Sequence, residues 1–443
     1  MTTSASGGSD PGITPAAQRL AFWGWLTGAL FFFYAWVLRV TPSVMVDDLM
    51  RDLSVGAGAI GGLSAFYFYS YAGLQLPIGM LIDRYGPRRL MTLAGLGCAV
   101  GCALFAFSTS LWALSAARFL IGAAAGFSLV GAMAVAGQWF PPARFALLSG
   151  FAMMLGMAGG VFGQAPMRLA VEASDWRTAM LVTGAGGIVI AVAAWATVRD
   201  RRRGPRGLGS VFTGLGHVAR NPQTWLLAVA GLGSTGPLLG FAGLWGVPYL
   251  VTTQGLSQSQ AAGITSFVFI GWGVGAPVFG WLSDRIKLRR PPFVCGLLLS
   301  AAALATLVLA PGLTPAAIAG LCFLSGFGGS AQIVGFAATR EHNPTRFSGT
   351  AIGLVNGMMT GGGALYQPLV GWLLDLGWNG QLAGGARVYD AETYRMAFLV
   401  LIAGTVIAAI CAFLLRETRC QSLEERQAAS GSLSAPDKPV AIR

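Results

Sequence analysis

Two arginines stand inside long apolar stretches of this 443-residue chain, and their guanidinium groups are well suited to bind an anion. Arg39 follows the segment FFFYAWVL, and Arg118 follows the segment LWALSAA. An ionised side chain within lipid is costly and therefore marks function. A guanidinium presents a fixed fork of donors that fits a carboxylate or a phosphate. We predict an anion contact at Arg39, with snorkelling to the outer headgroups as the alternative. For Arg118 the position favours a structural role, tying its helix to a neighbouring backbone, over contact with substrate.

Aromatic and amide side chains in other apolar stretches could complete such a site. Tyr67, Tyr71 and Gln75 recur every four residues and therefore share one face of a helix. Tyr34 precedes Arg39 in the same stretch. The remaining candidates are Gln164, Trp245, Gln332, Asn356 and Gln367. Packing between helices is the alternative role for all of these side chains.

The acidic residues and histidines that often carry catalysis or bind metals are nearly missing from these stretches. No Asp or Glu falls clearly inside one, and the six cysteines show no CxxC spacing. Neither a zinc site nor a disulfide framework is therefore indicated. No nucleophile lies beside a base, so we predict no enzyme, no metal site and no cofactor.

The composition predicts that these side chains are positioned by membrane-spanning helices. The chain is 54% hydrophobic and 10% charged, whereas soluble domains are roughly 25% charged. This composition excludes an ordinary soluble enzyme, a disordered chain and a nucleic-acid binder. A bilayer-crossing helix needs about 20 mostly apolar residues, and the sequence holds twelve such runs. They begin near Leu20, Val55, Leu90, Leu111, Phe145, Thr178, Gln223, Ala261, Pro292, Ala316, Phe347 and Met396. We predict an all-α membrane protein with twelve transmembrane helices.

The charge distribution predicts the orientation of the chain. The net charge is +12, and the longest basic stretch runs from Arg199 to Pro222, between two apolar halves. Basic residues favour the cytoplasmic side, so both termini are expected there, in a multi-pass protein of the cell inner membrane. The predicted parts are a disordered tail at 1–18, a six-helix bundle at 19–198, a basic linker at 199–222, a second bundle at 223–415 and a tail at 416–443. The expected partners are a small-molecule solute and the lipid bilayer, without nucleic acid, and the expected state is a monomer.

An internal repeat relates the two halves. Residues 79–89 read GMLIDRYGPRR, and residues 280–290 read GWLSDRIKLRR. A second echo pairs PARF at 142–145 with PTRF at 344–347. A duplicated six-helix unit explains both echoes and predicts two pseudo-symmetric bundles with a substrate site at their interface.

These motifs resemble those of the major facilitator superfamily. The resemblance rests on the loop residues Gly79, Asp83, Arg84, Gly86, Arg88 and Arg89, on their second copy Asp284, Arg285, Arg289 and Arg290, and on Arg118, Gly122 and Gly126. The second copy has Lys287 where the family's glycine would fall. The resemblance implies twelve helices, alternating access and a conformational gate formed by Asp83, Arg84, Arg88, Arg118, Asp284 and Arg285. The carboxylate of Asp83 is suited to the positive N-terminus of a neighbouring helix.

The expected function is movement of a small carboxylate-bearing solute across the inner membrane. Arg39 falls where similar organic-anion transporters carry an arginine, and the segment LRVTPSVMVDDL resembles phagosomal nutrient transporters that take up amino acids. The chain departs from proton-linked anion symporters by lacking a titratable relay, and from phosphate-ester exchangers by lacking an arginine in the seventh run. Uniport, exchange and coupling to another ion stay open. Two alternatives are an exporter of amphiphilic or drug-like compounds and a sensor that no longer transports.

Overall fold

The structure is a computed structural model that describes residues 15–200 and 208–426. Residues 1–14, 201–207 and 427–443 lie outside it, so the predicted tails and linker are described only in part. The elements, in chain order, are α1 (Pro15–Val40), η1 (Thr41–Val44), α2 (Val46–Leu53), α3 (Ala57–Gly73), α4 (Gln75–Tyr85), α5 (Pro87–Phe107), α6 (Leu111–Ala125), α7 (Phe127–Trp139), α8 (Pro142–Phe162), α9 (Ala165–Ala173), α10 (Trp176–Thr197), α11 (Leu208–Ala219), α12 (Pro222–Gly240), η2 (Phe241–Trp245), α13 (Gly246–Gln254), α14 (Gln258–Ile286), α15 (Arg290–Leu309), α16 (Pro315–Gly329), α17 (Gln332–His342), η3 (Thr345–Phe347), α18 (Ser348–Leu376), β1 (Leu382–Ala383), β2 (Ala386–Arg387) and α19 (Ala391–Leu414).

Ten helical segments in the described part of the chain are long and apolar enough to cross a membrane. The other two predicted spans fall on α3 with α4 and on α18. Leu74 interrupts the first of these, and glycine, threonine and asparagine make the second less apolar. Both lie within the bundle, where α3 packs directly against α18.

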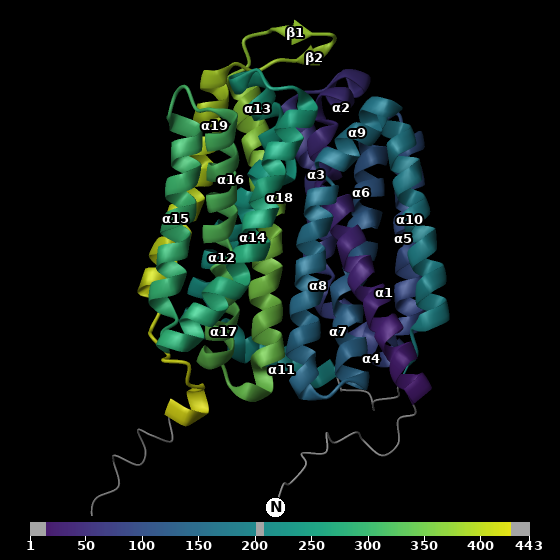
Figure 1. Cartoon of the computed structure of the whole chain (residues 1–443), viewed down its shortest axis with the longest axis vertical. Coiled ribbons are helices and arrows are strands. Elements are labelled where there is room, and N and C mark those ends of the chain that lie inside the picture. The colour runs from purple at the N-terminus through teal and green to yellow at the C-terminus, as the bar shows by residue number, and fades with distance from the viewer. Residues whose placement is uncertain (1–14, 201–207, 427–443) are drawn as a thin grey trace, which may run out of the picture.

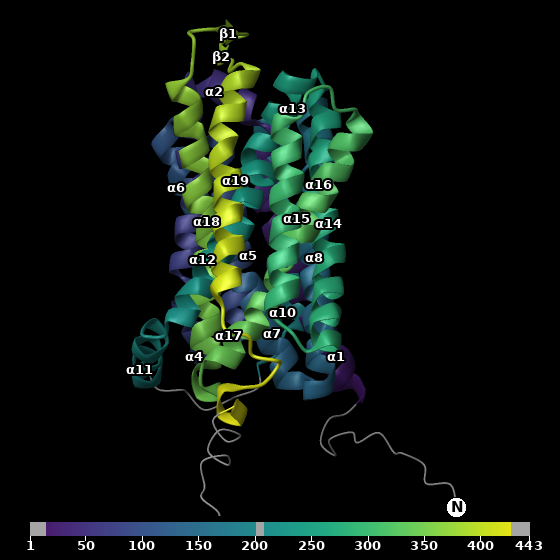
Figure 2. The same cartoon turned by 90° about the vertical axis from the view of Figure 1, so that its left-hand side faces the viewer.

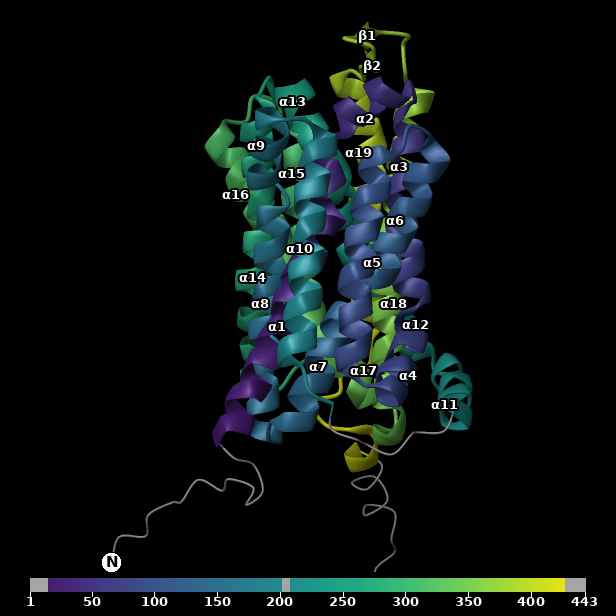
Figure 3. The ribbon, with the colours of Figure 1, turned by 90° about the vertical axis from the view of Figure 1, so that its right-hand side faces the viewer.

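The long helices stand side by side, and most run the full height of the molecule (Figure 1). α1 begins and α19 ends at one end of the bundle, which we call the tail end (Figure 1). α2, α13 and the β1–β2 hairpin lie at the opposite end, which we call the hairpin end (Figure 2). α11 lies beside the tail end, within the predicted linker (Figure 3).

Several long helices are interrupted inside the bundle. α1 ends at Val40, because Pro42 lacks the N–H that an α-helix needs, and the short 3-10 turn η1 follows. The candidate membrane span nevertheless runs on through η1 to Val44. α8 gives way to α9 at Gln164, and α12 passes into the π-helical turn η2. Such interruptions free backbone groups, and in transporters they often surround binding sites.

The hairpin is a small departure from the all-α prediction. β1 pairs with β2 in antiparallel register, with Leu382 opposite Arg387 and Ala383 opposite Ala386. Gly384 and Gly385 form the turn with φ angles of 55° and 86°. Two consecutive residues with positive φ are the requirement of a tight two-residue hairpin turn, which glycine meets without strain.

Candidate functional site

Arg39 occupies the last turn of α1, close to the interruption at Pro42. Its side chain is only 4% exposed. The end of α1 thus places a buried guanidinium inside the bundle, just before η1.

Three aromatic rings surround this guanidinium, and we call them the aromatic cage. The Arg39 Cζ atom lies 4.2 Å from the ring centroid of Trp36, 4.6 Å from that of Tyr71 and 5.5 Å from that of Tyr67. Tyr67 and Tyr71 stack with a 17° angle between their planes. Cation–π attraction stabilises a guanidinium in such a cage. The predicted shared face of Tyr67 and Tyr71 is therefore turned toward Arg39.

The cage leaves donors of Arg39 unused. Its Nε and Nη2 atoms are buried and have no hydrogen-bond partner. Among the ion pairs of the described residues, none involves Arg39. A buried charge without a partner is expensive, so the arrangement favours an anion that supplies acceptors to these N–H groups.

Arg118 on α6 holds the end of α1. Its Nη1 donates to the Leu38 carbonyl at 2.7 Å, and its Nη2 donates to the Arg39 carbonyl at 3.4 Å. The last carbonyls of a helix lack intrahelical partners, and a cation there also complements the helix dipole. The Arg118 Cζ lies 4.8 Å from the Tyr67 ring. Tyr67 therefore contacts both guanidinium groups, and its hydroxyl donates to Ala35 at 3.2 Å.

Two other predicted site residues have their polar atoms engaged inside the bundle. The Tyr34 hydroxyl donates to the Thr183 carbonyl at 2.9 Å, which directs it toward α10. The Trp245 indole N–H donates to the Gln367 carbonyl at 2.9 Å. The described contacts bring neither side chain to the aromatic cage.

The predicted amides lie in several places. Gln164 joins the two halves, because its Nε2 donates to the Ala242 carbonyl at 2.5 Å and its Oε1 accepts from Ser43. Gln367 donates to Leu239 at 3.0 Å, and its Oε1 is buried without a partner. Gln332 accepts from Ser234 at 3.2 Å, while its Nε2 is buried and unpartnered.

The last two predicted amides are less enclosed. Gln75 is the first residue of α4, directly after the interruption at Leu74, and its Nε2 is buried without a partner. Asn356 is half-buried on α18. Gln75, Gln332 and Gln367 therefore each have a polar atom without a partner, to which a ligand could form a hydrogen bond.

Two predicted gate residues of the first loop motif are exposed, and a third is half-buried. Asp83 and Arg84 both face solvent, and Arg84 lies 5.3 Å from the Tyr85 ring. Arg88 donates to the Trp195 carbonyl at 2.9 Å, and its backbone N–H donates to Asp200. Asp200 thus stabilises the start of α5 within the first half.

The second loop motif forms a charge network within its own half. Arg289 pairs with Asp284 at 2.7 Å and with Glu341 at 2.7 Å. Glu417 accepts the backbone N–H groups of Arg289 and Arg290. Burial alone would raise the pKa of Glu417, but these N–H donors hold it below its usual value. Arg285 is exposed and lies 5.6 Å from the Trp281 ring.

Sequence reasoning did not identify the contacts that Asp375 makes between the two halves at the hairpin end. The Asp375 carboxylate accepts from the backbone N–H groups of Ala57 at 3.1 Å and Gly58 at 2.8 Å. It also accepts from Tyr389 at 2.6 Å. Asp375 at the end of α18 thereby caps the start of α3 in the other half. The Gly56–Ala57–Gly58 sequence was the available signal, since this helix start has no capping side chain of its own.

Replacing Asp375 by asparagine should loosen the hairpin end. A carboxylate at a helix N-terminus contributes about 1 kcal/mol, so we expect about a fivefold rise in alkylation of a cysteine introduced at Met45 by an impermeant maleimide. Met45 is fully buried at this end. Glu392→Gln, which removes an exposed carboxylate at the same end, is the control. Equal alkylation rates in both variants would refute the role of Asp375.

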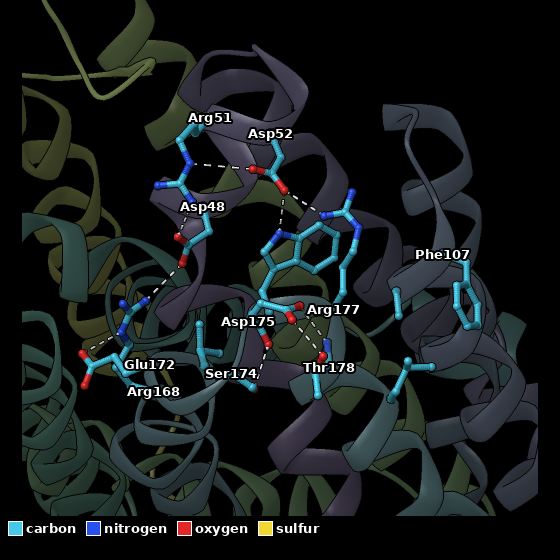
Figure 4. Close-up of a pocket in the computed structure, with 14 residues that line it drawn as sticks. Asp48, Arg51, Asp52, Phe107, Arg168, Glu172, Ser174, Asp175, Arg177 and Thr178 are labelled. Atoms are coloured by element: carbon cyan, nitrogen blue, oxygen red, sulfur yellow. Dashed lines mark hydrogen bonds and ion pairs between the residues drawn. The ribbon is translucent and has the colours of Figure 1, made fainter.

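A separate cavity of about 780 Å³ opens at the hairpin end of the first half. Figure 4 shows its charged rim, in which the basic and acidic side chains pair with one another. Arg168 pairs with Asp48 at 3.2 Å, and Arg177 pairs with Asp52 at 2.7 Å. These ion pairs fasten α2 to α9 and α10, so the rim offers no uncompensated charge comparable to Arg39.

A helical membrane bundle with a buried, unpaired cation beside interrupted helices is the arrangement expected of a membrane transport protein. The sequence profile of the Major Facilitator Superfamily matches residues 25–263 and 239–441. The chain belongs to that superfamily, a family of transporters.

Individual relatives are distant in sequence. The "Probable galactarate/D-glucarate transporter GudP" of Bacillus subtilis (strain 168) is 23% identical, over 91% of this chain and 93% of that protein. The "Membrane sensor protein UhpC" of Escherichia coli (strain K12) is 26% identical, over 88% and 89%. The crystal structure of a bacterial homolog of the human lysosomal transporter Spinster, inward-facing and unoccupied, has a TM-score of 0.74 at 18% identity, over 93% and 98%. This structural likeness shows a shared fold.

Proposed function

We propose that this protein carries a small organic anion bearing a carboxylate across the inner membrane, and that Arg39 binds the anionic group. The observation behind this proposal is the buried Arg39 fork, in which two donor nitrogens, Nε and Nη2, lack partners. A carboxylate would accept from these donors in a charge-assisted pair. Trp36, Tyr67 and Tyr71, whose ring centroids lie 4.2 to 5.5 Å from the guanidinium carbon, would hold the fork in place.

Relatives support an organic anion as the solute. GudP is named for the transport of galactarate and D-glucarate, which are dicarboxylates rich in hydroxyl groups. The unpartnered amide atoms of Gln75, Gln332 and Gln367 are suited to hydroxyl groups on such a solute. An amino acid also presents a carboxylate and belongs in the same test.

We further propose that transport alternates between two states of a twelve-helix bundle made of pseudo-symmetric halves. The hairpin end would face outward and the tail end, with both termini, the cytoplasm. In this structure the cross-half hydrogen bonds made by Ala57, Gly58, Asp47 and Gln164 cluster toward the hairpin end. Asp83 and Arg84 are exposed in this structure. In the opposite state they would close the conformational gate by contacting the start of α18.

The direct test is binding followed by flux. A thermal-shift screen of the purified protein should include galactarate, D-glucarate, monocarboxylates and amino acids, because a ligand that binds the folded state raises the melting temperature. Uptake of the best radiolabelled ligand into proteoliposomes then tests transport. Stabilisation by drug-like cations alone would instead support an exporter of amphiphilic compounds.

A second candidate function is sensing without transport, which the similarity to UhpC favours. The same Arg39 site would bind the anion in a sensor. Stabilisation by an anion with no flux in proteoliposomes would support sensing, whereas flux above that of empty liposomes would support the carrier.

A further inference from the structure

A carboxyl group lies between the two halves at the hairpin end. Asp47 on α2 accepts a hydrogen bond from the side-chain amide of Gln258, the first residue of α14, at 2.8 Å. α2 belongs to the first half and α14 to the second, so this contact spans the interface that must part if the hairpin end opens. Asp47 is partly buried, which leaves it within reach of protons from the adjacent solution.

The partner amide has an unused acceptor. Gln258 Oε1 is buried and has no hydrogen-bond donor, although Nε2 of the same amide donates to Asp47. An ionised carboxylate only accepts hydrogen bonds, whereas a protonated one also donates. Protonation of Asp47 would therefore supply the donor that Gln258 Oε1 lacks and convert one hydrogen bond into a reciprocal acid–amide pair.

The other groups around Asp47 are of mixed charge. Asp48 and Arg51 lie on its own helix, Arg168 faces it from α9, and Tyr394 interacts with it from α19. From β2, Arg387 is directed to Asp375 at 3.3 Å. Burial, followed by the charge of Asp48, raises the pKa of Asp47, against the opposing effects of Arg168, Gln258 and Arg51.

We propose that Asp47 and Gln258 form a proton-operated latch, in which a proton taken from the outer solution by the Asp47 carboxylate closes the hairpin end. The latch rests on the alternation of states proposed above. Opening this end would separate Asp47 from Gln258 and hydrate it, so the pKa in the open state falls toward the ordinary value. A group with a higher pKa in the closed state favours closure as pH falls through that pKa. The gain is complete below the open-state pKa and is lost at higher pH.

The test measures the distance across the hairpin end in the full chain. Nitroxide labels at Thr109→Cys, between α5 and α6, and at Thr252→Cys, on α13, report opening; both native side chains are exposed. Cys295, Cys411 and Cys420 are replaced by serine because they are the accessible cysteines. Electron–electron double resonance in nanodiscs between pH 7.5 and pH 5 gives the ratio of short to long distances. We expect this ratio to rise on acidification, by at most about tenfold per pH unit for one titrating group.

Two variants separate the latch from general acid effects. Asp47→Asn mimics the neutral acid, since its amide donates to Gln258 Oε1, and should keep the short distance at every pH. Gln258→Leu retains the carboxyl group but removes its partner, and should lower the short-distance fraction at pH 5. Asp52→Asn, which removes a carboxylate paired with Arg177 and Trp176, should leave the pH dependence in place.

The outcomes separate the latch from the alternation. The latch alone would be overturned if two distance populations were present and their ratio did not change with pH. A pH dependence that persisted in Asp47→Asn would also overturn it. A single distance distribution at every pH would overturn both the latch and the alternating states on which it rests.

Discussion

Arg39→Ala should reduce uptake of the transported anion at subsaturating concentration by at least about 100-fold. Two charge-assisted hydrogen bonds at roughly 1.5–3 kcal/mol each disappear with the guanidinium. Arg39→Lys should recover little of this loss, because an ammonium lacks the planar fork that grips a carboxylate. Uptake into proteoliposomes at matched protein density is the measurement.

The same substitution should not damage the fold. Two nitrogens of the Arg39 guanidinium donate no hydrogen bond, and Arg39 pairs with no carboxylate among the described residues, so its removal strands no buried anion. We expect the ligand-free melting temperature of Arg39→Ala to equal or exceed that of the native protein, while the shift caused by the anion is lost. Arg395→Ala, at an exposed arginine of the hairpin end, should retain both uptake and the ligand shift. Native uptake by Arg39→Ala would refute the binding role.

Gly122→Leu should prevent the first half from packing. Even a Cβ atom at this position of α6 would overlap the Tyr67 carbonyl and the Ser70 hydroxyl of α3. Small residues permit such close approach between membrane helices, and a rigid backbone carbonyl has no room to yield. We expect destabilisation of 3 kcal/mol or more, at the upper end of overpacking costs. It should appear as loss of the monodisperse peak in size-exclusion chromatography.

Gly62→Leu is the matched control for this substitution. Gly62 lies on α3, and a Cβ atom there meets no other atom within 4 Å. This variant should elute like the native protein. A native elution profile for Gly122→Leu would show that α3 and α6 separate at little cost. The aromatic cage would then depend less on this packing than its geometry indicates.

Much of the fold followed from the order of residues. Runs of apolar residues predicted the membrane helices, and the two loop motifs predicted the superfamily. The interruption of α1 at Pro42 was less visible, because the apolar run continues past it to Val46. The two-residue strands of the hairpin are too short to produce an alternating pattern, and only Gly384–Gly385 marked their turn.

The candidate site was predictable in part. Arg39, Tyr67 and Tyr71 were identifiable because charge and aromatic rings are conspicuous in an apolar run. Trp36 belongs to the cage as well, at 4.2 Å from the guanidinium. Tyr34 looked similar in sequence, yet its position on α1 directs its hydroxyl to Thr183 on α10.

Hydropathy and charge along the chain were enough to identify a helical membrane protein with a guanidinium in an apolar run, because both are properties of single residues and their neighbours in sequence. Which groups are left without partners depends instead on how the helices pack. Arg118 donates to the free carbonyls at the end of α1, and Asp375 accepts from the N–H groups at the start of α3. Arg39 contacts aromatic rings, but its Nε and Nη2 atoms have no acceptor. Hydrogen-bond partners come from residues remote in sequence. The unpartnered donors that indicate a ligand can therefore be recognised only once the packing of the helices is known.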